Sequence, residues 1–227
     1  MGKRVNQVNV TLDPKGITDL PYEEVRAILR GADNLIMRGG RAMLVKVLKG
    51  SRAKKLLELG LDQSPVYGFY RALSIEAITA KVDWAIINGY LKLEYDYRLP
   101  LLAYTERGWA IEKDTYTDEL LEILERESKS GQFEQVYTLK DRDRSMILLL
   151  LAKIEATGDR GFIPVLEAWA KVDYKKVQKA IHEVIGTLSR VGAYRVAEEC
   201  PAYPNNLVDL AEYRNRKQLR SNPGGLS

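Results

Sequence analysis

The sequence feature that most restricts the fold is a helical segment followed directly by two segments in which polar and apolar residues alternate. Ser74 is a predicted N-cap, apolar residues recur on one helical face over residues 75–86, and Asn88-Gly89 is a helix stop signal. Polar and apolar side chains then alternate with period two over residues 90–95 and more loosely over residues 101–105, with Asp96–Pro100 between them. Such alternation on both sides of a short connection predicts a β-hairpin.

Shorter helical segments precede this helix and hairpin. Apolar spacing predicts one helix that starts near Pro21, a second over residues 41–48, and a third that Ser51 caps and Gly60 ends. Several short helices, one longer helix and a hairpin, in this order, are the elements of a winged helix. We therefore expect a mainly α fold with a small β-hairpin wing.

The second half of the sequence is predicted to be helical. A helix over residues 117–127, capped by Thr117, is followed by a linker-like segment (SKSGQ, 128–132) and by helices over residues 145–156, 162–170 and 174–189. The predicted division of the chain is an N-terminal arm (1–18), a winged helix (19–113), a helix with linker (114–140), a small helical domain (141–212) and a basic, disordered tail (213–227).

Composition excludes several functional classes. The chain has one cysteine, Cys200, and one histidine, His182, which excludes an internal disulfide framework and leaves little material for a zinc site or histidine-based catalysis. The longest apolar run, Met146–Ala152, is far shorter than the roughly 20 residues that span a bilayer, and the first residues contain no apolar segment typical of a signal peptide. We expect a cytoplasmic, non-enzymatic binding protein without cofactor or metal.

Positive charge is concentrated, although the formal net charge is only +4. Residues 37–57 contain seven cationic side chains and no acidic one, namely Arg38, Arg41, Lys46, Lys49, Arg52, Lys54 and Lys55. A second cluster in the tail consists of Arg214, Arg216, Lys217 and Arg220, whereas residues 115–134 are rich in acid. An uninterrupted cationic segment on a nearly neutral chain indicates a polyanionic partner, and the alternative is a solvated helix face.

Short matches in a fixed order connect the first half with a known domain. They are Leu48-Lys49-Gly50-Ser51, Lys54-Lys55, Leu59-Gly60, Val66-Tyr67-Gly68, Leu73-Ser74, Asn88-Gly89-Tyr90-Leu91 and Leu102-Ala103-Tyr104-Thr105-Glu106-Arg107-Gly108. In this order and spacing they resemble the RQC domain, the winged-helix module at the C-terminal side of RecQ helicases. Arg38-Gly39-Gly40 and the first helix fit the preceding part of that domain. The resemblance implies a DNA-binding winged helix.

The sequence also departs from a RecQ helicase. It contains no Gly-rich phosphate loop ending in Gly-Lys-Ser/Thr, it lacks the four cysteines of the RecQ zinc module, and Tyr70 stands where the family's Tyr-Gly-x-Gly loop has its second glycine. The chain is therefore similar to small bacterial proteins of the RQC-minor type, in which the module stands alone. Residues 141–191 resemble HEAT-type helical repeats, which implies that this half docks on the winged helix or on a partner.

The resemblance assigns a role to the turn at Gly50. In the RQC family this Gly-Ser turn and the basic residue after it hold the DNA backbone, which implies this role for Lys49, Ser51 and Lys55. Helix N-terminal N–H groups, a serine hydroxyl and lysine ammonium groups are suitable donors to phosphate. The full predicted backbone-binding set is Arg38, Arg41, Lys46, Lys49, Ser51, Arg52, Lys54 and Lys55. The alternative is that Gly50 only ends one helix and Ser51 only caps the next.

The wing and one tryptophan provide further candidates. Tyr95 and Tyr97 lie at or near the predicted wing tip, where an aromatic ring can stack on an exposed base, and Arg98 can reach a phosphate. In RecQ relatives the wing hairpin can wedge against a terminal base pair; the alternative is that both tyrosines are ordinary strand residues. Trp84 lies off the apolar face of its helix, so we expect it at an interface with the second domain or a partner.

These observations predict a DNA-binding, nucleoid-associated protein that grips duplex backbone at ends, forks or junctions with low sequence specificity. It would be an accessory in DNA repair or replication to a separate helicase or repair factor, bound through the helical half. The helix at 74–88 offers Lys81 but also Glu76 and Asp83, a poor set for reading base edges. Two alternatives stay open: a sequence-specific winged-helix transcriptional regulator, and a protein-interaction scaffold that acts through the helical half.

Overall fold

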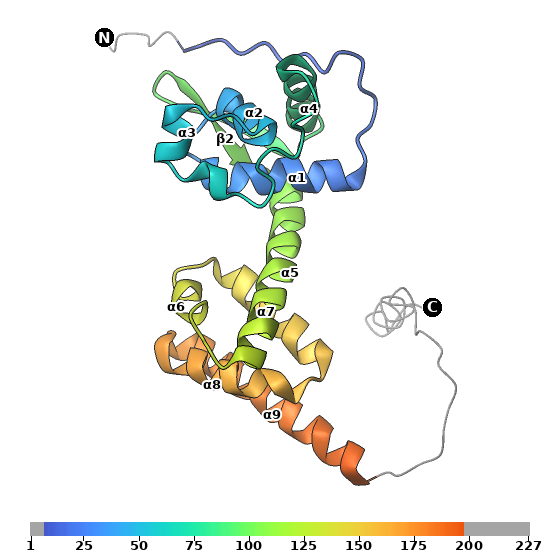
Figure 1. The fold of residues 1–227 in the computed structure, drawn as a ribbon, viewed down its shortest axis with the longest axis vertical. Coiled ribbons are helices and arrows are strands. Elements are labelled where there is room, and N and C mark those ends of the chain that lie inside the picture. The colour runs from blue at the N-terminus through green and yellow to red at the C-terminus, as the bar shows by residue number, and fades with distance from the viewer. Residues whose placement is uncertain (1–6, 198–227) are drawn as a thin grey trace, which may run out of the picture. The chain divides into compact units, whose positions relative to one another are not determined.

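The computed structural model describes residues 7–197, with side chains up to residue 190 (Figure 1). The predicted basic tail, with Arg214, Arg216, Lys217 and Arg220, lies outside the described residues, as do Cys200 and the first six residues of the arm. Within the described part, no helix combines the length and the apolar character needed to cross a membrane.

The first half contains four α-helices and a hairpin in the predicted order. The helices are α1 (Tyr22–Ala32), α2 (Arg41–Lys49), α3 (Lys54–Glu58) and α4 (Ile75–Ile87), with short 3-10 turns at Asp33–Leu35 and Leu61–Gln63. Strands β1 (Leu91–Asp96) and β2 (Leu99–Tyr104) pair antiparallel, from Leu91 opposite Tyr104 to Asp96 opposite Leu99. The predicted mainly α fold with a small wing is confirmed.

Local signals in the sequence position α4 and the wing. The Ser74 hydroxyl accepts a hydrogen bond from the Ala77 N–H at 3.1 Å, as an N-cap serine should. The chain before α2 lies beside β2, because the Met37 N–H donates to the Leu102 carbonyl and the Leu102 N–H donates to the Gly39 carbonyl, both at 2.9 Å. Strand β2 is therefore hydrogen-bonded to the segment before α2 as well as to β1.

The described part of the second half contains five helices. They are α5 (Glu106–Ser130), α6 (Val136–Leu139), α7 (Arg144–Thr157), α8 (Ile163–Val172) and α9 (Lys175–Ala197), with a 3-10 turn at Arg160–Phe162. Their order agrees with the predicted helical half, and their assignment to HEAT-type repeats stays a prediction.

The predicted start of the fifth helix at Thr117 is wrong. Thr105 caps this helix, since its hydroxyl accepts from the Gly108 N–H at 3.0 Å, and Thr117 lies inside it, donating to the Lys113 carbonyl at 2.9 Å. The buried face of the first turns includes Gly108 and Glu112. Because these residues are not apolar, the helical period was not visible there. The predicted linker at 128–132 likewise begins inside α5.

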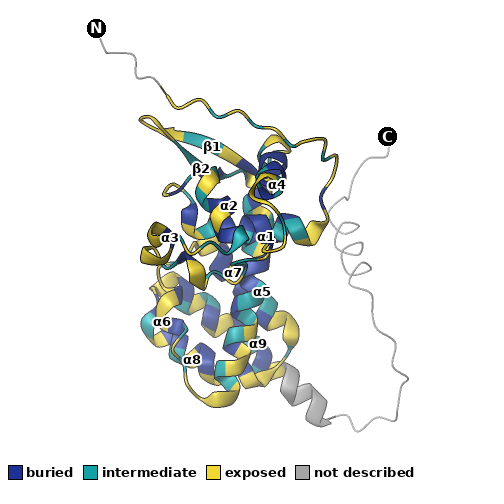
Figure 2. Ribbon diagram, turned by 45° about the horizontal axis from the view of Figure 1, so that its top comes forward, coloured by how far each residue is buried: buried dark blue, intermediate teal, exposed yellow. Residues whose placement is uncertain are grey.

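Two hydrophobic cores stabilise the two halves. The first core joins α1–α4 and the hairpin around fully buried residues such as Ile28, Leu48 and Ile78. The second core joins α5–α9 around residues such as Leu150 and Trp169. Figure 2 shows the buried residues on the helices and the exposed ones along the N-terminal arm and the outer end of the hairpin.

Arg30 connects α1 with α5 through buried charge. Its Nε lies 2.9 Å from both carboxylate oxygens of Glu119, and its guanidinium lies 4.1 Å from the centre of the Tyr116 ring. Glu112 lies 3.5 Å from the same guanidinium, is fully buried, and neither of its carboxyl oxygens accepts a hydrogen bond within the described residues. Burial raises the pKa of the Glu112 carboxyl to about 8.

The raised pKa of Glu112 makes stability depend on pH. The unfolded carboxyl titrates near 4.5, so the folded state binds the extra proton between pH 4.5 and about 8, and the free energy of unfolding falls as pH rises through this window. Glu112→Gln removes the ionisable group. We expect this variant to be more stable than the wild type at pH 9, by on the order of 3 kcal/mol, and little different at pH 5.

Urea unfolding at pH 5, 7 and 9 measures this difference. Glu122→Gln is the matched control, because Glu122 is an exposed carboxyl on the same helix. A stability difference between Glu112→Gln and the wild type that is the same at all three pH values would contradict the prediction.

Candidate nucleic-acid interface

The turn after α2 is held in place by a second loop. Gly50 ends α2 with φ of +76°, and its N–H donates to the Val47 carbonyl at 2.9 Å. The loop at Gly68 lies directly against it: a Cβ on Gly50 would lie 3.1 Å from the Gly68 Cα. The Gly68 N–H donates to the Val47 carbonyl at 2.9 Å, and the Tyr70 N–H to the Leu48 carbonyl at 2.8 Å. Gly50 therefore ends the helix, as predicted, and also permits this close contact.

Ser51 does not cap the following helix, so that prediction is wrong. Helix α3 begins at Lys54 after Ala53, which makes no capping side-chain bond. The Ser51 hydroxyl instead accepts from the Ala53 N–H at 3.3 Å, a local serine turn that keeps the chain extended before the helix starts. The Ser51 carbonyl accepts from the Tyr67 hydroxyl at 3.0 Å, which ties this turn to the Gly68 loop.

Three cationic side chains converge on a hollow beside this turn. The hollow has a volume of about 380 Å³, and we call it the α2 pocket; its lining residues are Lys46, Lys49, Gly50, Ser51, Arg71 and Ile75. The Lys49 ammonium donates to the carbonyls of Arg71 at 2.7 Å and Leu73 at 2.6 Å. Lys46 and Arg71 are exposed and form no ion pair within the described residues. Among the described residues, no acidic one lines the pocket.

Sequence reasoning missed Arg71. It lies outside the cationic run of residues 37–57, and its nearness to the Tyr67-Gly68 turn was the only available signal. A Cβ on Gly68 would lie 3.1 Å from the Arg71 Nη2, so the glycine leaves room for the guanidinium. Arg71 thus reaches the α2 pocket because the Gly68 loop packs against the turn after α2.

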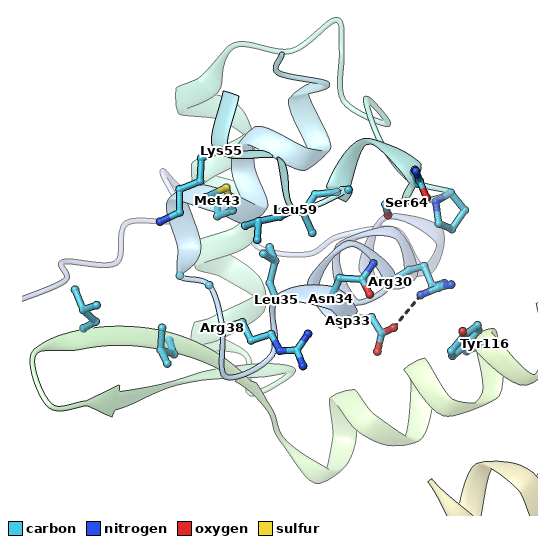
Figure 3. A pocket seen from close by; sticks show the side chains of 18 of the residues that line it. Arg30, Asp33, Asn34, Leu35, Arg38, Met43, Lys55, Leu59, Ser64 and Tyr116 are labelled. Carbon is cyan, nitrogen blue, oxygen red and sulfur yellow. Dashed lines mark hydrogen bonds and ion pairs between the residues drawn. The ribbon is translucent and has the colours of Figure 1, made fainter. Parts of the chain in front are cut away.

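Arg38 and Lys55, from the predicted backbone-binding set, lie at a different pocket. This hollow of about 720 Å³, the α3 pocket, is lined by the cations Arg30, Arg38, Lys55 and Arg142, by Asp33, and by apolar residues including Leu35, Met43 and Leu59. Figure 3 shows Leu35 between Lys55 and Arg38. Arg52 and Lys54 are exposed and line neither pocket, and Lys54 lies 3.7 Å from Glu58. The predicted set is therefore distributed over more than one site.

Arg41 has a partner inside the fold. Its Nη1 lies 2.7 Å from both oxygens of Asp83, which is 1% exposed, and donates to the Thr11 carbonyl at 3.0 Å. Asp83 also accepts from the Asp13 N–H at 2.9 Å. A buried carboxylate requires a nearby counter-charge. Arg41 supplies it and holds the N-terminal arm against α4, which leaves this guanidinium less available to a phosphate than a free surface arginine.

The wing tip consists of Tyr97 and Arg98, between β1 and β2. The Tyr97 side chain is 69% exposed, and its φ is +53°, a left-handed conformation that is unfavourable for a residue with a Cβ. The Arg98 guanidinium lies 5.8 Å from the centre of the Tyr97 ring. Tyr95 is instead engaged by the arm, because its hydroxyl donates to the Val8 carbonyl at 3.0 Å and the Val8 N–H donates to the Arg98 carbonyl at 3.2 Å.

The predicted interface role of Trp84 is wrong. Trp84 is 5% exposed and belongs to the first core. It stacks on Tyr90 with ring centres 5.7 Å apart and an interplanar angle of 25°. Helix α4 is buried on more than one face, because the hairpin that follows it covers the side on which Trp84 lies. Position on the helical wheel therefore did not predict exposure.

The geometry of the Gly50 turn predicts a measurable stability effect. Gly50→Ala places a Cβ in a left-handed conformation and against the Gly68 backbone, so we expect it to lower the free energy of unfolding by more than the roughly 1–2 kcal/mol of the left-handed conformation alone. Gly60→Ala is the control, because Gly60 has φ of +64° and open space around it. Equal losses in urea unfolding would contradict the close contact.

The strained wing tip gives a second test. Tyr97→Gly relieves the positive φ, and we expect it to raise the free energy of unfolding by about 1 kcal/mol. Tyr97→Ala removes the same ring but keeps a Cβ, so it should not stabilise the protein. Thermal unfolding followed by circular dichroism compares the two, and a lower melting temperature for Tyr97→Gly than for Tyr97→Ala would oppose this interpretation.

A mainly helical domain with a hairpin wing and a cationic pocket at a helix end has the features of a winged-helix nucleic-acid-binding domain. Residues 21–129 match the family model of the RQC domain. The resemblance of this segment to the RQC domain is thus confirmed, and the match suggests a DNA-binding module of the RecQ type. The match extends into α5, past the predicted domain boundary at 113. Comparisons with curated proteins and with solved structures gave no match.

Proposed function

We propose that this chain is a non-catalytic DNA-binding protein whose RQC domain holds duplex backbone with low sequence specificity. The observation that carries the proposal is the α2 pocket, where Lys46, Lys49 and Arg71 converge without an acidic neighbour. Three like charges in one hollow repel one another, and a bound phosphate relieves that repulsion. Contacts to phosphate position the protein on DNA without reading its sequence.

The polar groups of α4 support low specificity over the alternative of a sequence-specific regulator. Lys81, the one cation in this helix, lies 2.5 Å from Glu24 and its side chain is 19% exposed. The Thr79 hydroxyl donates to the Ile75 carbonyl at 2.8 Å. Both groups are therefore engaged within the protein, which leaves α4 poorly equipped to contact base edges in the major groove.

The wing supports a preference for duplex ends, forks or junctions. Tyr97 is the most outward aromatic residue of the hairpin, and Arg98 lies beside it. A terminal base pair offers a free base face on which such a ring can stack, whereas the faces of internal base pairs are covered by their neighbours. We further propose a cytoplasmic, nucleoid-associated accessory to a separate helicase or repair factor, because the sequence contains no phosphate loop of a motor.

Charge reversal in the α2 pocket tests the proposal. We expect Lys46→Glu with Arg71→Glu to weaken binding to blunt duplexes of unrelated sequence alike, by about tenfold or more at moderate salt. The slope of log K against log salt should also become shallower by roughly 2, because two phosphate contacts are lost. Fluorescence anisotropy at several salt concentrations measures both quantities.

The control for this experiment carries the same change of charge elsewhere. Lys129→Glu with Lys171→Glu alters two exposed lysines that line neither the α2 pocket nor the α3 pocket. Equal losses for both double variants, a flat salt response of the wild type, or a strong preference for one duplex sequence would count against the proposed function.

A further inference from the structure

The helical half contains a cationic hollow of its own. It has a volume of about 550 Å³ and lies between the segment 140–147 and the start of α9; we call it the α9 pocket. Its cationic lining residues are Lys140, Arg142, Arg144, Lys175 and Lys176. Tyr174 lies among them with 59% of its surface exposed, and the Lys140 ammonium lies 5.0 Å from the centre of its ring.

The fold separates charges that alternate in the sequence. Residues 140–144 read Lys-Asp-Arg-Asp-Arg, so this segment is almost neutral. All three cations line the pocket, whereas Asp141 and Asp143 do not. Asp143 instead caps α7, because its carboxylate accepts from the Ser145 N–H at 2.9 Å and the Met146 N–H at 3.1 Å. The cations are thereby collected on one side of the segment.

One acidic residue of the described part, Asp173, lines the pocket, and its carboxylate already accepts hydrogen bonds from within the helical half. The Asp173 carboxylate accepts from the Trp169 Nε1–H at 2.7 Å and from the Tyr174 N–H at 2.6 Å, and the residue is 7% exposed. Within residues 7–190, none of the five cations forms an ion pair. Five positive charges around one hollow, with Asp173 as the one carboxylate in the described lining, leave an excess of positive charge that suits a polyanion.

We propose that the α9 pocket binds single-stranded nucleic acid, with the cations on its phosphates and Tyr174 stacked on an unpaired base. This inference rests on the proposed function, because the strand would continue from the duplex held by the RQC domain. Arg142 lines both the α9 pocket and the α3 pocket, so the cationic surface continues from one to the other. An accessible ring among cations favours a single strand, since only unpaired bases can leave their neighbours to stack on protein.

The test compares a blunt duplex with the same duplex carrying a single-stranded tail of about 12 nucleotides of deoxythymidine. We expect the full chain to bind the tailed duplex about tenfold more tightly than the blunt one. Arg144→Glu with Lys175→Glu and Lys176→Glu should abolish this gain and leave blunt-duplex binding close to that of the wild type. Tyr174→Ala, which removes an exposed ring, should reduce the gain without affecting folding.

A triple variant with the same change of charge is the control. Lys129→Glu, Lys171→Glu and Lys179→Glu alter exposed lysines that do not line the α9 pocket and should preserve the gain from the tail. Circular dichroism of every variant checks that it is folded, and anisotropy of the labelled DNA reports affinity.

The outcomes separate this inference from the proposed function. No gain from the tail in the wild type, or equal losses in the pocket and control variants, overturns the α9 site while duplex binding stands. Displacement of the tail by poly-glutamate at lower concentration than by oligo-deoxythymidine also overturns it and indicates an acidic protein partner. Absence of binding to either DNA overturns both proposals. Loss of blunt-duplex binding in Lys46→Glu with Arg71→Glu, with the gain from the tail retained, supports two separate sites.

Discussion

The backbone contact between Gly50 and Gly68 is the constraint on which the α2 pocket depends. Because neither residue has a side chain, the turn after α2 and the loop before α4 lie against each other, and the amides of Gly68 and Tyr70 bond to the end of α2. The Tyr70 side chain secures the same loop, since it is buried in the first core and its hydroxyl donates to Glu24 at 2.7 Å. Arg71 follows directly and is carried into the pocket. The cationic site is thus a consequence of how two loops pack on one helix end.

Features with local causes were predictable from the sequence. The cap at Ser74, the helix end at Gly50 and the period-two alternation of the wing each depend on residues close together in the chain, and each has the predicted structure. The predictions were wrong where the structure depends on packing between different elements of the fold. Trp84 is buried because Tyr90, just before the hairpin, stacks on it. The first turns of α5 escaped detection because a buried carboxyl, Glu112, occupies a position where an apolar residue signals a helix.

The same distinction between local and long-range causes explains which cations reach the α2 pocket. The run of cations over residues 37–57 contributes Lys46 and Lys49 to the α2 pocket, but nearness in sequence did not mean a common surface. Arg41 turns toward Asp83, 42 residues further along the chain, while Arg71 enters from outside the run. A buried acid attracts whichever cation the fold brings to it, and nothing in the spacing of the cations shows which one that will be.

The formal net charge consequently underestimates the local positive potential at the surface of this protein. Asp143 caps α7, Asp173 bonds to an indole and Asp83 pairs with Arg41, so within the described residues none of these acids forms an ion pair with a cation of the α2 or α9 pocket. The described lining of the α2 pocket contains no acidic residue, and that of the α9 pocket contains Asp173 beside five cations. A chain with a formal charge of only +4 can therefore display strongly positive hollows in both of its halves, because local pairing, more than composition, determines the potential that a phosphate backbone meets.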